Sequence, residues 1–266
     1  YAILPRAAML MAAAGTAVAL KNAQLGQSGF LTAGLIGLAL VFLERRPVLA
    51  GIFIGLLIYK PHFGILFPLA LVAGRQWKAF ASAAATVLLL AAIATIAFGA
   101  HVWSAFFASL HGFDGTLTAD PGFEIGFQSL FGLLRWYGAS PLLALSAHMV
   151  FAALLTVLVC TLWWLPTPYP LKAAALCIGA VAVTPYVLAY DLCALAMAVA
   201  FFVQDGLRRG FYAGERVTLL VCFMLAAFLA RPFGALLDAV LIGVVVWRLV
   251  AERRELRAFA GAPVSL

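Results

Sequence analysis

A lysine stands within a long apolar stretch of the sequence, where a charge is costly and by default marks a functional site. Lys60 lies between the apolar segments 47–59 and 62–73 and is followed directly by Pro61. Its ammonium group could bind the phosphate of a lipid-linked molecule, and backbone groups left free by the proline could help. It could instead extend to a membrane interface for structural reasons alone.

A carboxylate occupies a similar place later in the chain. Asp191 follows an apolar run and stands directly after Tyr190. It could bind a sugar hydroxyl, it could less readily act as a base, or it could pair with Lys60 or Arg231 only for structure. Both functional interpretations require elements that place these residues together.

A short glycine-bearing turn is the third candidate. Gly26, Gln27, Ser28 and Gly29 precede an apolar segment. A glycine-rich turn before a helix presents free backbone N–H groups that suit a phosphate. A plain turn explains the same residues equally well.

The histidines and cysteines do not indicate a metal site. His62, His101 and His111 come from distant segments without the spacing of metal ligands, and His148 lies within an apolar segment. The four cysteines, which all fall in apolar segments, are interpreted as packing residues. We therefore expect neither a metal nor a cofactor.

The composition is that of an integral membrane protein. Of the 266 residues, 66% are hydrophobic and 10% charged, against about 25% charged in a soluble domain, and the mean hydropathy is +1.10. Several apolar runs approach the roughly 20 residues needed to cross a bilayer. The net charge of +7 does not indicate nucleic acid, because basic residues of membrane proteins gather in cytoplasmic loops.

The hydropathy pattern predicts an all-α, polytopic transmembrane bundle of about ten membrane segments. They span residues 3–20, 29–43, 47–59, 62–73, 79–99, 140–164, 171–184, 192–204, 215–230 and 233–250. The pair 47–59 and 62–73 is too short to cross about 30 Å of hydrocarbon at 1.5 Å per residue. We interpret it as a broken pair, and 171–184 with 192–204 as a second one.

Charge sorting fixes one orientation. Thirteen of the 17 basic residues fall on one side, which the positive-inside rule makes cytoplasmic. They are Arg6, Arg45, Arg46, Arg75, Lys78, Lys172, Arg208, Arg209, Arg216, Arg248, Arg253, Arg254 and Arg257. Lys60, Asp191, the glycine-bearing turn and all four histidines then lie towards the external side.

The pattern predicts one transmembrane domain over residues 1–258 and a cytoplasmic tail over 259–266. The domain includes an external loop, 100–139, with helices that lie in the membrane interface. Within it, Glu124, Gln128 and Arg135 form a polar stripe over 123–137, opposite Phe127, Leu130, Phe131 and Leu134, which is typical of an interfacial helix. Asp238, in the last segment, has no evident partner.

These features resemble bacterial glycosyltransferase family 87. The resemblance rests on LGQSGFLTAGLIGLALVFLERRPVLAGIFIGLLIYKPHFGILFPLALVAGRQWKA, where a Gly-Gln turn, an apolar helix, a basic loop, a Gly-rich helix and a Lys-Pro element follow in order. The later TPYVLAYDLCAL resembles the family's second signature, a proline-bearing break followed by an acid or histidine. The resemblance as a whole covers about residues 15–200.

The resemblance implies a GT-C type enzyme of the bacterial inner membrane. Such enzymes transfer a hexose, often mannose, from a polyprenyl-phosphate donor to a lipid or glycan acceptor on the external or periplasmic face. Lys60 matches the Lys-Pro element, Gln27 the Gly-Gln turn and Asp191 the second signature, which implies binding of phosphate or sugar. His62, Tyr190 and Arg231, on the same predicted face, are further candidates.

The resemblance also implies a main catalytic acid in a first external loop, which we expect to precede Tyr1 in a longer protein. The competing interpretation is a transporter or flippase for a lipid-linked or anionic substrate, because broken helices also build transporter sites. A non-catalytic scaffold would leave Lys60 and Asp191 as an unexplained cost.

Overall fold

The computed structural model describes residues 22–109, 126–225 and 234–261, with side chains placed for all of these except Leu225 and 253–261. The described part is helical. Its elements are α3 (Gly29–Phe42), α4 (Pro47–Gly55), the 3₁₀-helix η1 (Leu56–Tyr59), α5 (Pro61–Gly64), α6 (Leu66–Ala73), α7 (Trp77–Phe98), α9 (Leu130–Trp136), α10 (Pro141–Trp164), α11 (Tyr169–Ala182), the 3₁₀-helix η3 (Ala189–Ala194), α12 (Leu195–Arg209), α13 (Glu215–Leu225) and α14 (Gly234–Gly261). A further helical stretch follows α7 over 101–109.

Four helical segments in the described part are long and apolar enough to cross a membrane. They are Trp77–Phe98, Pro141–Trp164, Ala189–Arg209 and Gly234–Glu252. The predicted all-α membrane bundle is confirmed. Each predicted segment from 29–43 onward overlaps a helix of the described residues, while 3–20 and 226–233 lie outside them, so a count of ten stays a prediction.

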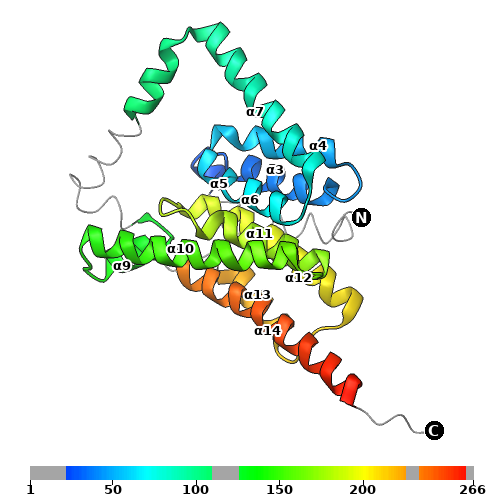
Figure 1. Cartoon of the computed structure of the whole chain (residues 1–266). Helices are drawn as coiled ribbons and strands as arrows, with labels where there is room; N and C mark the ends of the chain where they lie inside the picture. The colour runs from blue at the N-terminus through cyan, green and yellow to red at the C-terminus, as the bar shows by residue number, and fades with distance from the viewer. Residues whose placement is uncertain (1–21, 110–125, 226–233, 262–266) are drawn as a thin grey trace.

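Helix α11 forms the centre of the bundle. All its residues except Tyr169 and Lys172 are buried, and it packs on α6, α10, α12 and α14. Figure 1 shows the helices α3 to α6 on one side of α11 and α13 with α14 on the other. Small residues allow this close packing: a Cβ at Gly179 would lie 2.5 Å from Cδ2 of Leu66.

Two glycines one turn apart fix the broken segment against α7. A Cβ at Gly51 would lie 2.4 Å from the carbonyl oxygen of Ala79, and one at Gly55 would lie 2.5 Å from Cβ of Thr86. This Gly-x-x-x-Gly spacing lets two helix backbones approach in an apolar medium, where packing and not water expulsion drives association. The remainder of α7 is largely exposed, as expected for a helix that faces lipid.

The predicted interfacial helix over 123–137 is wrong for the described residues 126–129, which are not α-helical. The described helix is Leu130–Trp136, and Glu124 lies outside the described residues. Gln128 is 2% exposed, and its backbone N–H donates to the carbonyl of Val187 at 2.7 Å. Its Oε1 accepts from the N–H of Gly234 at 3.2 Å. The periodicity could not reveal these long-range partners, which turn a predicted surface residue inward.

Candidate functional site

Lys60 occupies the break between two short helices. Its backbone is extended, at φ −133° and ψ 74°, between η1 and α5. Pro61 is the cause, because a proline disfavours helical geometry at the residue before it while suiting the first position of a new helix. The break predicted from the sequence is therefore present, and it holds the lysine at a point where the chain reverses.

Asp191 is held in a turn of its own. It lies in η3, after the non-helical stretch that ends α11. Its Oδ2 accepts a hydrogen bond from the backbone N–H of Leu188 at 3.2 Å, and its own N–H donates to the Leu188 carbonyl at 2.9 Å. These two bonds fix the carboxylate to its own loop, so its direction does not depend on the lysine.

The two charges form an ion pair. Nζ of Lys60 lies 2.7 Å from Oδ1 of Asp191, and the side chains are 17% and 3% exposed. The ammonium also lies 4.8 Å from the ring centroid of Tyr190 and 5.7 Å from that of Phe63. Aromatic faces attract cations at this range. The lysine is therefore oriented by one carboxylate and two rings, and it keeps the more exposed position of the pair.

The glycine-bearing turn lies against the same loop. Oδ1 of Asn22 accepts a hydrogen bond from the N–H of Gly29 at 2.9 Å. A Cβ at Gly29 would lie 2.3 Å from the carbonyl oxygen of Tyr190, so only glycine fits there. The hydroxyl of Tyr59, next to Lys60, donates to the carbonyl of Ser28 at 3.3 Å. The turn, the Lys-Pro break and the Tyr190 loop thus meet in one place.

The remaining predicted residues lie around this point or outside the described chain. Gln27 is exposed on the turn, and Tyr190 is half-buried beneath the lysine. His62 is half-buried, with its ring centroid 4.3 Å from that of Phe63. Arg231, like His111, lies outside the described residues.

A second loop supports the first. Oγ of Ser129 donates to the carbonyl of Pro185 and accepts from the N–H of Gly132 at 3.2 Å, which begins α9. The ring of Tyr186 packs on those of Phe127 and Phe131, with centroids 5.7 and 6.4 Å apart. Sequence reasoning missed this supporting role, although an aromatic pair beside a capping serine was visible.

The model of glycosyltransferase family 87 matches residues 2–189, which include the turn and the Lys-Pro break and end just before Tyr190. The chain belongs to glycosyltransferase family 87. With its apolar spans, it is an integral membrane glycosyltransferase. No curated protein and no solved structure matches it significantly.

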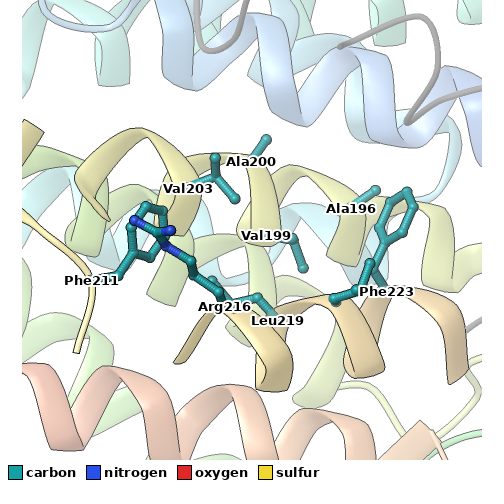
Figure 2. A pocket seen from close by; sticks show the side chains of 9 residues that line it. Ala196, Val199, Ala200, Val203, Phe211, Arg216, Leu219 and Phe223 are labelled. Carbon is teal, nitrogen blue, oxygen red and sulfur yellow. The ribbon is translucent and has the colours of Figure 1, made fainter. Parts of the chain in front are cut away.

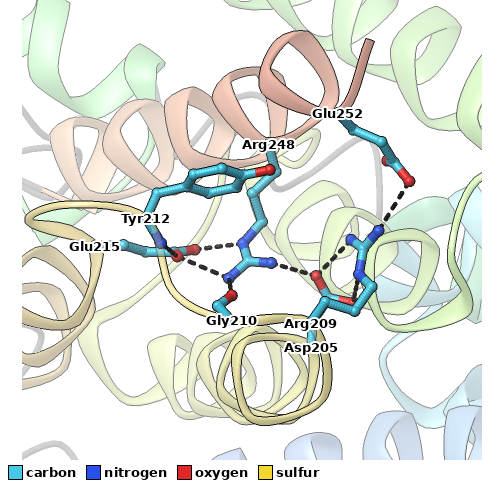
Figure 3. A network of polar contacts seen from close by, with 7 residues as sticks. All are labelled: Asp205, Arg209, Gly210, Tyr212, Glu215, Arg248 and Glu252. Carbon is cyan, nitrogen blue, oxygen red and sulfur yellow. Dashed lines mark hydrogen bonds and ion pairs between the residues drawn. The ribbon is translucent and has the colours of Figure 1, made fainter. Parts of the chain in front are cut away.

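A buried ionic network lies elsewhere in this family 87 protein (Figure 3). Arg248 of α14 is 2% exposed and pairs with Asp205 of α12 and Glu215 of α13. Arg209 pairs with Asp205 at 2.7 Å and with Glu252 at 2.9 Å. The network fastens three helices at one end of the bundle. Sequence reasoning placed its arginines at the cytoplasmic side but missed their partners, for which the Asp205–Arg209 spacing was the only signal.

In the described part of the chain, no three His, Cys, Asp or Glu side chains lie close enough together to bind a metal ion. Nδ1 of His148 and Oδ1 of Asp238 are buried without a hydrogen-bond partner among the described residues. Nε2 of His148 lies 3.2 Å from the carbonyl of Val183.

Proposed function

We propose that this glycosyltransferase moves a hexose, with mannose the first candidate, from a polyprenyl-phosphate donor to a lipid or glycan acceptor. The reaction takes place on the external or periplasmic face of the bacterial inner membrane. The observation that carries the proposal is the Lys60–Asp191 ion pair, set at a helix break beside a glycine-bearing turn. Family membership supports glycosyl transfer over the alternative of a transporter or flippase.

The orientation is supported by the positions of the basic loops. Arg45 and Arg46 lie between α3 and α4, and Arg75 lies between α6 and α7. Lys60 is at the reversal midway between them. If the basic loops are cytoplasmic, the ion pair opens towards the external side, where lipid-linked sugars are used.

Lys60 is the proposed contact of the donor phosphate. Breaking the bond between the anomeric carbon and the phosphate oxygen leaves negative charge on the polyprenyl phosphate. A positioned ammonium stabilises that charge as it develops, in the manner of other preorganised electrostatic sites. Because Lys60 is partly exposed and Asp191 is held by Leu188, the lysine can turn to a phosphate without releasing the carboxylate's own loop.

Asp191 is the proposed contact of a sugar hydroxyl. Each of its oxygens already accepts one hydrogen bond, and a carboxylate offers about four acceptor positions. The free positions suit donation by hydroxyls. Its contact with Nζ of Lys60 at 2.7 Å favours a binding role, and removal of the acceptor proton is assigned to another residue.

The other candidates have supporting roles in this proposal. Tyr190 orients the lysine through its ring, and Gln27 presents an exposed amide on the turn beside it. His62 follows the Lys-Pro break, and Arg231 stays a candidate for the phosphate.

The test is transfer of radiolabelled mannose from polyprenyl-phosphate-mannose in membranes that carry the complete gene product. Membranes without the protein give the background, and donors bearing glucose or arabinose give the sugar preference. We expect label in a lipid or glycan product, lost with Lys60→Ala and retained with Lys78→Ala, which removes an exposed lysine elsewhere. No transfer from any of the three donors would refute the proposal, and substrate flux would then test the transporter.

A further inference from the structure

An apolar groove runs between α12 and α13 (Figure 2). Its volume is about 240 Å³, and Val199, Val203, Leu219 and Phe223 line it, with Phe211 and Arg216 at one end. Pockets that enclose a whole drug-sized ligand measure roughly 300–1,000 Å³. The groove is therefore suited to a slender apolar chain, and its one charged lining residue stands at the end and not in the middle.

The arginine at this end has no acidic partner in the described part of the chain. The guanidinium carbon of Arg216 lies 4.7 Å from the ring centroid of Phe211, and the side chain is exposed. The nearby carboxylates are bound elsewhere: Glu215 holds Arg248, and Asp205 holds both Arg209 and Arg248. The network thus neutralises its own arginines and leaves Arg216 as a cation available to an external anion.

A glycine fixes the arginine at the mouth of the groove. A Cβ at Gly206 would lie 2.3 Å from the ring of Phe211, so the ring packs directly on the backbone of α12. The guanidinium of Arg216 stacks on this same Phe211 ring, which holds it beside the groove. The arrangement is a positioned cation next to an apolar channel, which matches the two parts of a phospholipid.

The ion pair and the arginine end of the groove lie at opposite ends of one span. Asp191 is near the start of Ala189–Arg209, and Gly206, on which the Phe211 ring packs, is near its end. At 1.5 Å per residue, these points are separated by roughly 20 Å along the helix. The guanidinium of Arg216 therefore lies towards the membrane leaflet opposite to that of Lys60. A donor phosphate bound at Lys60 does not reach Arg216.

We propose that the groove binds an anionic phospholipid of the cytoplasmic leaflet. One acyl chain lies between α12 and α13, and the phosphate contacts the guanidinium of Arg216. Basic pockets between helices at this side of a membrane recognise anionic head groups. The lipid would join the loop 210–214 and α13 to the bundle, next to the ionic network.

Native mass spectrometry of the complete protein in detergent tests this proposal. Palmitoyl-oleoyl phosphatidylglycerol and the matching phosphatidylcholine are added in equal amounts, and retained lipid is counted. We expect preferential retention of phosphatidylglycerol, and an about five-fold loss in Arg216→Gln, since one basic residue near a charged lipid surface contributes about that factor. Arg208→Gln is the matched control, because Arg208 is exposed at the C-terminal end of α12 and does not line the groove.

A second variant tests the apolar part. Ala200→Phe, which fills the groove while leaving Arg216 in place, is expected to reduce retention as well, with thermal unfolding unchanged as the check on folding. Equal retention of both lipids, equal losses in Arg216→Gln and Arg208→Gln, or full retention in Ala200→Phe would each overturn the proposal. Stronger competition by farnesyl phosphate than by phosphatidylglycerol would also overturn it. The lipid measurements do not depend on sugar transfer, so the two proposals fail independently.

Discussion

The two partners of the Lys60–Asp191 ion pair should differ in how much the protein loses without them. Lys60→Met leaves the Asp191 carboxylate 97% out of contact with solvent, with only the Leu188 N–H as partner. Removing one partner of a buried pair costs about 3–5 kcal/mol. Asp191→Asn instead leaves a lysine that is 17% exposed, whose stem can extend towards the interface. We expect that variant to lose about 1–2 kcal/mol.

The assay is unfolding in mixed micelles titrated with sodium dodecyl sulfate, followed by circular dichroism. Lys78→Met removes an exposed lysine and should change the free energy of unfolding by less than about 0.5 kcal/mol. The double variant Lys60→Met with Asp191→Asn should resemble Asp191→Asn alone, because no buried charge is left. The reasoning is refuted if Lys60→Met costs no more than Asp191→Asn, or if the double variant is as unstable as Lys60→Met.

Two further predictions concern the packing that surrounds the site. Arg248→Met removes the arginine that pairs with the buried Asp205 and Glu215 and should cost about 3–5 kcal/mol of unfolding free energy. The control Arg208→Met should cost less than about 0.5 kcal/mol. Equal unfolding midpoints of the two variants in the same titration would contradict this prediction. Gly29→Ala should destabilise the protein and impair sugar transfer, because its Cβ would lie 2.3 Å from the Tyr190 carbonyl oxygen. Gly34→Ala, with open space at that position, should be neutral or slightly stabilising. Sugar transfer and unfolding of the two variants, measured side by side, check this prediction.

Local chemistry made much of the site predictable. Pro61 dictates a break at Lys60, and the apolar segments around it are too short to cross a bilayer, so a reversal there follows from the sequence. The pairing with Asp191 was one of several alternatives, and the packing of η3 against α3 brings Asp191 to Lys60.

Long-range partners were not predictable. Gln128 belongs to a pattern that suits an interfacial helix, yet it pairs with Val187 and Gly234, which are distant in sequence. Arg248 was counted as a cytoplasmic charge, yet it is buried between two carboxylates of other helices. In both cases the sequence shows that the side chain needs a hydrogen-bond or ionic partner, while the tertiary fold determines which group is that partner.

The most direct test is sugar transfer by the double variant Lys60→Met with Asp191→Asn, compared with the wild type in membranes that hold equal amounts of folded protein. We predict that this neutral variant folds and loses transfer from polyprenyl-phosphate-mannose by about 10²–10³-fold, the cost of removing a group that stabilises transition-state charge. Transfer at the wild-type rate by the neutral double variant would contradict the central claim that Lys60 binds the donor phosphate.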